Sequence, residues 1–219
     1  MKIAKQRIHG SPYVGIFATI TEKIGLFPKD ISNEQLKELQ ELLEIEIIKT
    51  NIANSSLMGV LCVGNSHGFI VSEIAEAREI KELTSVGLRV KKIPSIAAVG
   101  NLIEVNDSCG ICSKIFPREL KKDIEDFLKI SILDETIAGS DLIGSCMVLT
   151  KNGFLTNPNI VEKEFDSIKK FVKLNGTSTT ANYGDNFVGN SIIANSKGAI
   201  VGEQTTGFEL IRIDEGLHE

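Results

Sequence analysis

The sequence lacks tryptophan, and aromatic residues of all kinds make up only 5% of its 219 residues. No apolar run approaches the roughly 20 residues that are needed to cross a bilayer, and the polar N-terminal segment is unlike a secretory signal. We therefore expect a soluble, cytoplasmic protein without a membrane partner. With 42% hydrophobic residues, a chain of this length can bury a substantial core without disulfide bonds or metals.

Positive charge is also in short supply, because 24 Lys and Arg residues stand against 29 Asp and Glu residues and give a formal net charge of −5. General nucleic-acid-binding proteins gain affinity when clustered basic residues release counterions. The composition therefore argues against that class of protein. An acidic surface favours a basic protein partner, because complementary charge speeds and orients the encounter.

Cysteine and histidine are scarce, with four and three residues. Cys109 and Cys112 have the spacing of redox and zinc sites, but no second pair or nearby histidine completes a tetrahedral shell. Cys62 and Cys146 lie in apolar runs that are typical of buried free thiols. We interpret all four cysteines as core residues and keep a zinc or redox pair as the alternative.

What the sequence does contain is an internal repeat, which has to be sought before local structure is assigned. Ten-residue windows with a shared glycine pattern begin at residues 15, 59, 101, 144 and 189, so that successive windows are 44, 42, 43 and 45 residues apart. In the third of these windows, which begins at residue 101, the first glycine stands one place earlier, at Gly100. Five units of about 44 residues account for the chain.

Each unit has the same order of patterns. An apolar first strand, as at residues 190–194, is followed by a tight turn with glycine and by a second strand. An amphipathic helix comes next, as after the capping-box start at Ser32 or the helix-initiating Pro117. A third strand closes the unit, and we place it at residues 45–49, 88–90 and 130–133. We also assign Ile74, Ala77 and Ile80 to one helix face.

The two ends of the chain indicate how the units are assembled. The last unit runs out near Leu217 and leaves little room for a third strand, whereas residues 3–8 form an extra strand-like segment. We expect this segment to complete the fifth unit and close a ring, which also protects the open edges. Removal of residues 1–8 should then abolish cooperative folding.

The sequence thus predicts an α/β fold, a five-fold pseudosymmetric α/β propeller of ββαβ units that is closed by the N-terminal strand. We expect a single domain over residues 1–219. The approximate units are residues 9–50, 51–93, 94–135, 136–180 and 181–219.

A ring of five such units resembles the pentein architecture, whose enzymes modify guanidino groups with a nucleophilic cysteine, a histidine followed closely by an acid, and carboxylates that bind guanidinium. A reactive thiolate needs a neighbouring histidine or positive charge. His67 lies in a tight turn with no acid close behind it, so we interpret it as an exposed turn residue. We also find no Walker-type phosphate loop, no H-E-x-x-H helix and no G-x-S-x-G elbow.

We therefore expect no enzyme, no catalytic residues and no cofactor, and we keep a guanidine-modifying enzyme or hydrolase as the alternative. Asp107, Asp141 and Asp185 could meet near a central channel and hold a cation. Turn and capping roles are commoner for such residues, and we favour those roles.

Several motifs that occur in order along the chain resemble the translation initiation factor 6 family. These are GNSHGFIV at residues 64–71, GNL at 100–102, GFLTNP at 153–158 and NSKGAIVG at 195–202. The resemblance implies a non-enzymatic pentein that binds the large ribosomal subunit and sterically blocks its association with the small subunit. It also implies a role in late maturation of the large subunit, and an archaeal member, because the chain ends soon after the fifth unit.

The family resemblance further implies contact with a ribosomal protein on the subunit-joining face, near the sarcin–ricin loop of the rRNA, and release by an elongation-factor-like GTPase. We expect a monomer. For the ribosome-binding residues we choose Asn101 and its neighbour Gly100, and then Asn65. The alternative is that these residues only shape strand ends and hairpins.

Overall fold

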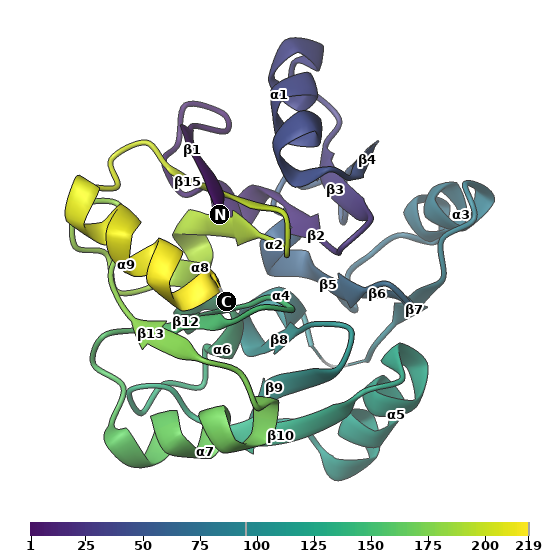
Figure 1. The fold of residues 1–219 in the computed structure, drawn as a ribbon. Coiled ribbons are helices and arrows are strands. Elements are labelled where there is room, and N and C mark those ends of the chain that lie inside the picture. The colour runs from purple at the N-terminus through teal and green to yellow at the C-terminus, as the bar shows by residue number, and fades with distance from the viewer. Residues whose placement is uncertain (95, 219) are drawn as a thin grey trace.

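The computed structural model describes residues 1–94 and 96–218, whose strands form five three-stranded sheets arranged around a central axis (Figure 1). In each sheet an antiparallel pair of strands is extended by a third strand that runs parallel to the middle one. This arrangement confirms the predicted α/β propeller of ββαβ units.

Four of the sheets are continuous in sequence. They consist of β2 (Thr19–Ile20), β3 (Ile24–Pro28) and β4 (Glu46–Thr50); β5 (Cys62–Asn65), β6 (Gly68–Val71) and β7 (Val90–Lys92); β8 (Ile103–Val105), β9 (Cys109–Ser113) and β10 (Ser131–Glu135); and β11 (Met147–Leu149), β12 (Phe154–Thr156) and β13 (Gly176–Ser178). The third strands begin one or two residues later than we predicted, which is an error of boundary and not of type.

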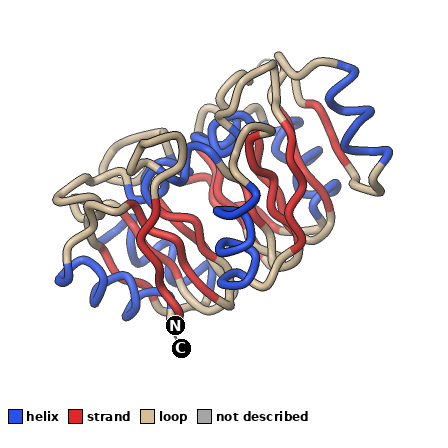
Figure 2. Tube along the Cα trace, turned by 90° about the horizontal axis from the view of Figure 1, so that it is seen from above, coloured by secondary structure: helices blue, strands red, loops and turns tan. Residues whose placement is uncertain are grey.

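The fifth sheet joins the two ends of the chain. It combines β14 (Ile192–Ala194) and β15 (Gly198–Gly202) with β1 (Lys2–Gln6), which pairs in parallel with β15. The Met1 ammonium group lies 2.7 Å from the Asp214 carboxylate near the C-terminal end of the chain. Figure 2 shows the two termini next to each other at one face of the ring. The predicted closure by the N-terminal strand is confirmed.

Five longer helices lie on the outside of the ring (Figure 1), namely α1 (Asn33–Leu43), α3 (Ala77–Ser85), α5 (Arg118–Leu128), α7 (Glu162–Val172) and α9 (Gly207–Leu217). The Ser32 hydroxyl accepts a hydrogen bond from the Gln35 amide at 3.2 Å, as a helix cap should. Gln35 itself bonds to the Arg7 carbonyl, so the predicted capping box is only half formed. Pro117 is the residue before α5 and does not lie in its first turn.

Each longer helix packs on the sheet of the preceding unit. Leu39 and Leu43 of α1 share a core with Ile200 of the fifth sheet, and Ile213 of α9 shares one with Leu155 of the fourth. The other three clusters combine Leu83 with Leu26, Ile124 with Ile70, and Ile168 with Ile111. Because burial of one such side chain contributes about 1.5–3 kcal/mol, each unit gains stability from its neighbour.

The prediction for the second unit's helix was wrong at its start. Ile74 is 50% exposed and precedes α3, which begins at Ala77. The Glu76 backbone N–H donates to the Glu79 carboxylate at 2.8 Å, and this cap fixes the start of the helix after Ile74. The helical spacing of apolar residues therefore starts at Ile74, three residues before the helix α3 itself.

One type of element was missed altogether. Before each first strand the chain makes a single helical turn, in η1 (Val14–Phe17), α2 (Met58–Leu61), α4 (Val99–Leu102), α6 (Ile143–Cys146) and α8 (Val188–Ser191). In the last unit, α8 covers Asn190 and Ser191, the first two residues of the first strand that we predict at residues 190–194. The short helical turns gather around the axis at the side of the ring opposite the termini (Figure 2).

Candidate binding site around the central channel

Five glycines, one in each short helical turn, form a closed ring. A Cβ added to Gly59 would lie 1.9 Å from the carbonyl oxygen of Gly15, and one added to Gly100 would lie 1.9 Å from that of Gly59. The same contact continues through Gly144 and Gly189 and returns to Gly15 at 2.0 Å. Only glycine permits this approach of two backbones. Gly100 is thus the true equivalent of the other four glycines, and the third window begins there.

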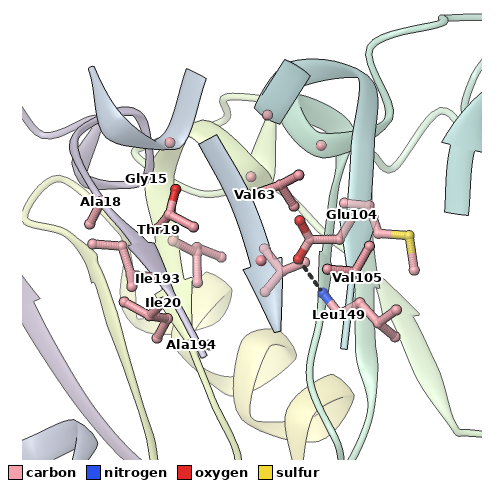
Figure 3. A pocket seen from close by; sticks show the side chains of 18 of the residues that line it. Gly15, Ala18, Thr19, Ile20, Val63, Glu104, Val105, Leu149, Ile193 and Ala194 are labelled. Carbon is pink, nitrogen blue, oxygen red and sulfur yellow. Dashed lines mark hydrogen bonds between the residues drawn. The ribbon is translucent and has the colours of Figure 1, made fainter. Parts of the chain in front are cut away.

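The ring and the first strands enclose a central cavity of about 90 Å³, which we call the channel (Figure 3). One residue of each first strand, four positions after the ring glycine, lines it. These residues are Thr19, Val63, Glu104, Val148 and Ile193. Among the described residues that line the channel, Glu104 is the one with a carboxylate.

The Glu104 side chain is enclosed by the channel walls and points between Val63 and Leu149 (Figure 3). One of its oxygens, Oε1, accepts a hydrogen bond from the Leu149 amide at 3.0 Å. Burial raises the pKa of Glu104 to about 8, and the hydrogen bond from Leu149 acts in the opposite direction. The carboxyl group of Glu104 is therefore mostly protonated at neutral pH. It lines a cavity in which its oxygens could still accept hydrogen bonds.

The hairpin turns form the other end of the channel, which we call the hairpin face (turns at residues 21–23, 66–67, 106–108, 151–152 and 195–197). Asn65 is 2% exposed there. Its amide donates to the carbonyls of Asn106 at 3.1 Å and Leu128 at 3.0 Å, and its oxygen accepts from the His67 amide at 2.9 Å. Every polar atom of the Asn65 side chain thus serves the fold.

The turn face, which carries the short helical turns and the segments before them (residues 8–17, 52–61, 96–102, 137–146 and 181–191), lies at the opposite end of the first strands. Gly100 and Asn101 are adjacent there on α4, and Asn101 is half-buried. No hydrogen bond of the Asn101 side chain occurs within residues 1–94 and 96–218. The structure therefore brings Gly100 and Asn101 together and places Asn65 away from them.

The three aspartates considered as a cation site do not converge. Asp107 lies on the hairpin face and accepts from the Ser66 amide at 2.7 Å, whereas Asp141 accepts from the Ser113 hydroxyl at 2.8 Å. Asp185 accepts from the Phe187 amide at 3.0 Å. In the part of the chain that the structure describes, no three His, Cys, Asp or Glu side chains are placed to hold a metal ion.

The cysteines are all buried. Cys109 and Cys112 lie three positions apart in β9, so their side chains enter different cores on opposite faces of the sheet. Burial raises the pKa of Cys109 to about 11, and burial with the nearby Asp134 carboxylate also raises the pKa of Cys112. Both groups remain thiols at neutral pH, and the two sulfurs cannot act as one site.

Buried glutamates connect the longer helices to the turn face. Glu164, at the third position of α7, accepts from the Thr136 hydroxyl at 2.6 Å and from the amides of Ala138 at 2.8 Å and Gly139 at 3.2 Å. Glu79 and Glu209 hold the corresponding turns in the same way. Burial alone would raise the pKa of Glu164, but these hydrogen bonds hold it below its ordinary value.

A signal in the sequence could have revealed the turn face. The pattern Ile-x-x-Ser-x-x-apolar-Gly occurs at residues 8–15, 52–59 and 137–144. In the structure the isoleucine and serine pair across a tight turn with left-handed residues, as in Ile52↔Ser55 around Ala53 and Asn54. The predicted windows start at the final glycine of this pattern, so the turn before that glycine lies outside them. The predicted site does not include Glu104, because the third window starts at residue 101, one residue after the ring glycine.

Comparison with known proteins agrees with this architecture. Residues 3–216 match the model of the eIF-6 family. The chain is similar to proteins named translation initiation factor 6 from Picrophilus torridus (37% identity, 98% of this chain and 99% of the relative) and Methanocaldococcus jannaschii (38% identity, 98% and 97%). A third relative of that name, from Thermoplasma acidophilum, is 35% identical over 98% of this chain and 99% of its own.

Solved structures with some likeness to the chain include an agmatine deiminase from C. jejuni (TM-score 0.38, 14% identity, 55% of this chain and 49% of the other). A second is a DDAH from Pseudomonas aeruginosa (TM-score 0.43, 11% identity, 94% and 72%). In the described residues no helix is long and apolar enough to span a bilayer.

Proposed function

The chain belongs to the eIF-6 family, and from this premise we propose that it acts as a translation initiation factor that binds the large ribosomal subunit and sterically prevents the small subunit from joining it. The full-length match to relatives named translation initiation factor 6 is the observation that carries the proposal. The same premise supports a role in late maturation of the large subunit, in the cytoplasm, and release by an elongation-factor-like GTPase.

We assign ribosome binding to the turn face. Equivalent positions directly before the short turns present Tyr13, Leu142 and Phe187, which are 42%, 39% and 38% exposed. Tyr183 on the same face is 83% exposed. Aromatic residues are enriched in protein interfaces, and exposed apolar side chains that gather on one face mark contact sites. The side-chain amide of Asn101, which has no hydrogen bond to any other described residue, adds a hydrogen-bonding group to this face.

A steric mechanism suits the closed ring. Standard interfaces bury about 800 Å² on each partner, which is a small part of the 9650 Å² surface of this protein. The remainder of a monomer bound in this way would stand in the path of the small subunit. The net charge of −5 favours a basic ribosomal protein at the joining face, near the sarcin–ricin loop, as the main contact.

The buried thiols support a factor without catalytic activity. A guanidine-modifying enzyme needs an activated cysteine, and both Cys109 and Cys112 are held as thiols in separate cores. Measurable turnover of arginine or agmatine by the purified protein would favour that alternative class.

Cosedimentation with purified archaeal large subunits tests the binding proposal. We expect the protein to pellet with large subunits at moderate salt and to reduce subunit joining in sucrose gradients. No association under these conditions would contradict the proposed function.

Matched variants test the assignment of the face. Tyr183→Ala and Asn101→Ala should weaken binding about tenfold or more if these residues are central to the interface. Lys151→Ala, an exposed change on the hairpin face, should leave binding unchanged. Loss of binding in the Lys151 variant with normal binding in the other two would place the contact on the hairpin face.

A further inference from the structure

A second cavity, of about 190 Å³, lies at the hairpin face between the first two units. Its walls come from the turn after β2, from the turn between β5 and β6, and from residues 87–89, which lead into β7. Three of the residues that line it are basic, namely Lys23, His67 and Arg89, and no Asp or Glu is among the described residues that do so. In a chain with a net charge of −5, this local excess of positive charge needs an explanation.

The protein itself does not neutralise these three side chains. None of them forms an ion pair within residues 1–94 and 96–218. The acids of the neighbouring turns are engaged elsewhere. Glu22 accepts a hydrogen bond from the Ser196 amide at 3.1 Å, and Asp107 accepts one from the Ser66 amide at 2.7 Å. The positive charge around the cavity is therefore available to a ligand.

Arg89 is exposed, but its guanidinium group is held in place. Its Nη1 donates a hydrogen bond to the His67 carbonyl at 2.9 Å, and its Cζ lies 4.7 Å from the centre of the Phe127 ring. A guanidinium group has five N–H donors, and the others of Arg89 have no partner in the part of the chain that the structure describes. A planar group fixed in this way loses little conformational freedom when it binds an anion.

The fold does not require basic residues at these positions. In each unit the third residue of the hairpin turn is equivalent, and so is the second residue after the left-handed residue that follows the longer helix. The turn positions are Lys23, His67, Ser108, Asn152 and Lys197, and the positions after the first four helices are Glu46, Arg89, Ser131 and Asn175. The third and fourth units thus form the same structure with uncharged residues at both positions.

We infer that this cavity binds a phosphate dianion, either free phosphate or the phosphate group of a small phosphomonoester. The N–H fork of Arg89 matches two phosphate oxygens, and the Lys23 ammonium group adds a compact charge. A volume of about 190 Å³ holds several water molecules of about 30 Å³ each, but it is smaller than the roughly 300–1,000 Å³ of pockets for larger ligands. The inference is independent of the proposed function, because ribosome binding is assigned to the opposite face.

NMR titration of the free protein tests the inference. The signals of the Arg89 side-chain Nε–H and of the Gly87 amide are followed at pH 7.5 and constant ionic strength as sodium phosphate, methyl phosphate or dimethyl phosphate is added. A phosphomonoester carries nearly two charges at this pH, because its second pKa is about 6, whereas the diester carries one. We expect a saturable shift with phosphate and methyl phosphate, and a response at least about tenfold weaker with dimethyl phosphate.

Matched variants identify the site. Lys23→Gln and Arg89→Gln should each weaken phosphate binding about tenfold, because each removes a charged hydrogen-bond donor. Lys81→Gln changes the net charge equally at an exposed position of α3 and should leave binding unchanged. The Lys23 variant is decisive if Arg89→Gln disturbs the contact with Phe127, since no contact within the described residues depends on the Lys23 side chain.

Three results would overturn the inference. The first is a shift that rises linearly with phosphate and does not saturate, and the second is equal affinity in the Lys23→Gln and Lys81→Gln variants. The third is equal binding of dimethyl phosphate and methyl phosphate, which would indicate recognition of a nucleic-acid backbone. The two supporting results distinguish the source of the phosphate group. Tighter binding of methyl phosphate supports a small phosphorylated molecule, and tighter binding of free phosphate supports the inorganic ion.

Discussion

The side chain that each ring glycine lacks determines how closely neighbouring repeats approach. At Gly100 the carbonyl oxygens of Gly59 and Cys62 occupy the space that a methyl group would take, at 1.9 and 2.8 Å. Both are backbone atoms of a neighbouring unit, so neither can rotate away. The closed ring of contacts means that strain at one glycine cannot be relieved without displacement of a whole repeat.

Gly100→Ala should therefore destabilise the protein by about 4 kcal/mol or more, a loss that point substitutions reach only through severe overpacking or strain. Chemical denaturation monitored by circular dichroism would measure it. The matched control is Gly207→Ala at the first position of α9, where an added Cβ meets nothing within 4 Å. This control should be neutral or stabilise by up to about 1 kcal/mol. Equal stability of the two variants would contradict the packing argument.

Glu104 gives the protein an unusual dependence of stability on pH. The folded pKa of about 8 lies above the value of about 4.3 for an unfolded glutamate, so the folded state binds an extra proton between these limits. The stabilising contribution is fully present below pH 4.3 and is lost as pH rises through 8. The slope is at most about 1.4 kcal/mol per pH unit, and water in the channel would reduce it.

Glu104→Gln should remove this slope. Urea denaturation at pH 5, 6, 7 and 8 should show the free energy of unfolding of the unaltered protein falling relative to that of the variant as pH rises. Parallel curves for the two proteins would show that Glu104 is not perturbed as described.

At the scale of elements, one residue joins a helix to a turn. The carboxylate of Glu164 lies at the start of α7 and accepts hydrogen bonds from the backbone of the tight turn at Ala138 and Gly139. Glu79 and Glu209 do the same in the second and fifth units, whereas the third position of α1 is Gln35 and that of α5 is Leu120. The turn face thus depends on helices that lie at the outside of the ring.

Glu164→Gln should destabilise the protein by about 2–3 kcal/mol at pH 7, because hydrogen bonds to a charged group contribute more than neutral ones. The pKa of Glu164 is lowered in the folded state, so its contribution is present above pH 4.3 and is lost as pH falls through the folded value. The difference between variant and unaltered protein should therefore shrink below about pH 4. Glu162→Gln, an exposed change in the same helical turn, should stay within about 0.5 kcal/mol.

Elements with strong periodicity could be predicted from the sequence, and those made by contacts between units could not. Leu39 and Leu43 mark the buried face of α1, and the glycine turns mark the hairpins. The short helical turn at Met58–Leu61 is too brief to show a period and is stabilised by its neighbours around the axis. Asn101 lies on such a turn. Asn65 lies in a hairpin, and its side-chain amide donates hydrogen bonds to backbone carbonyls of the next unit. Sequence alone could not separate these two roles.

At the scale of the whole molecule, β1 forms the seam of the ring. It supplies the third strand of a sheet whose other two strands lie at the opposite end of the chain. Removal of residues 1–8 should leave that sheet two-stranded, expose the edge of β15 and remove Ile8 from the core below α1. A two-stranded sheet is marginally stable in water.

We expect the truncated protein to lose its cooperative unfolding transition, which calorimetry would detect. Lys5→Ala changes an exposed side chain of β1 and preserves the backbone pairing, so it should unfold like the unaltered protein. A sharp transition in the truncated protein near the original melting temperature would show that the seam is dispensable.

Each hydrophobic core contains residues of two successive repeats, and the contacts between the ring glycines form a closed circle. The number of repeats in the chain is therefore fixed. Proteins with open, stacked repeats can gain or lose a module by duplication or deletion and still cap their ends. Here an in-frame insertion or deletion of one repeat would change the size of the ring. The N-terminal strand β1 could then no longer reach β15 in the geometry that closes the ring. The family is thus expected to diversify by substitution and by lengthening of surface turns, while the number of modules stays at five.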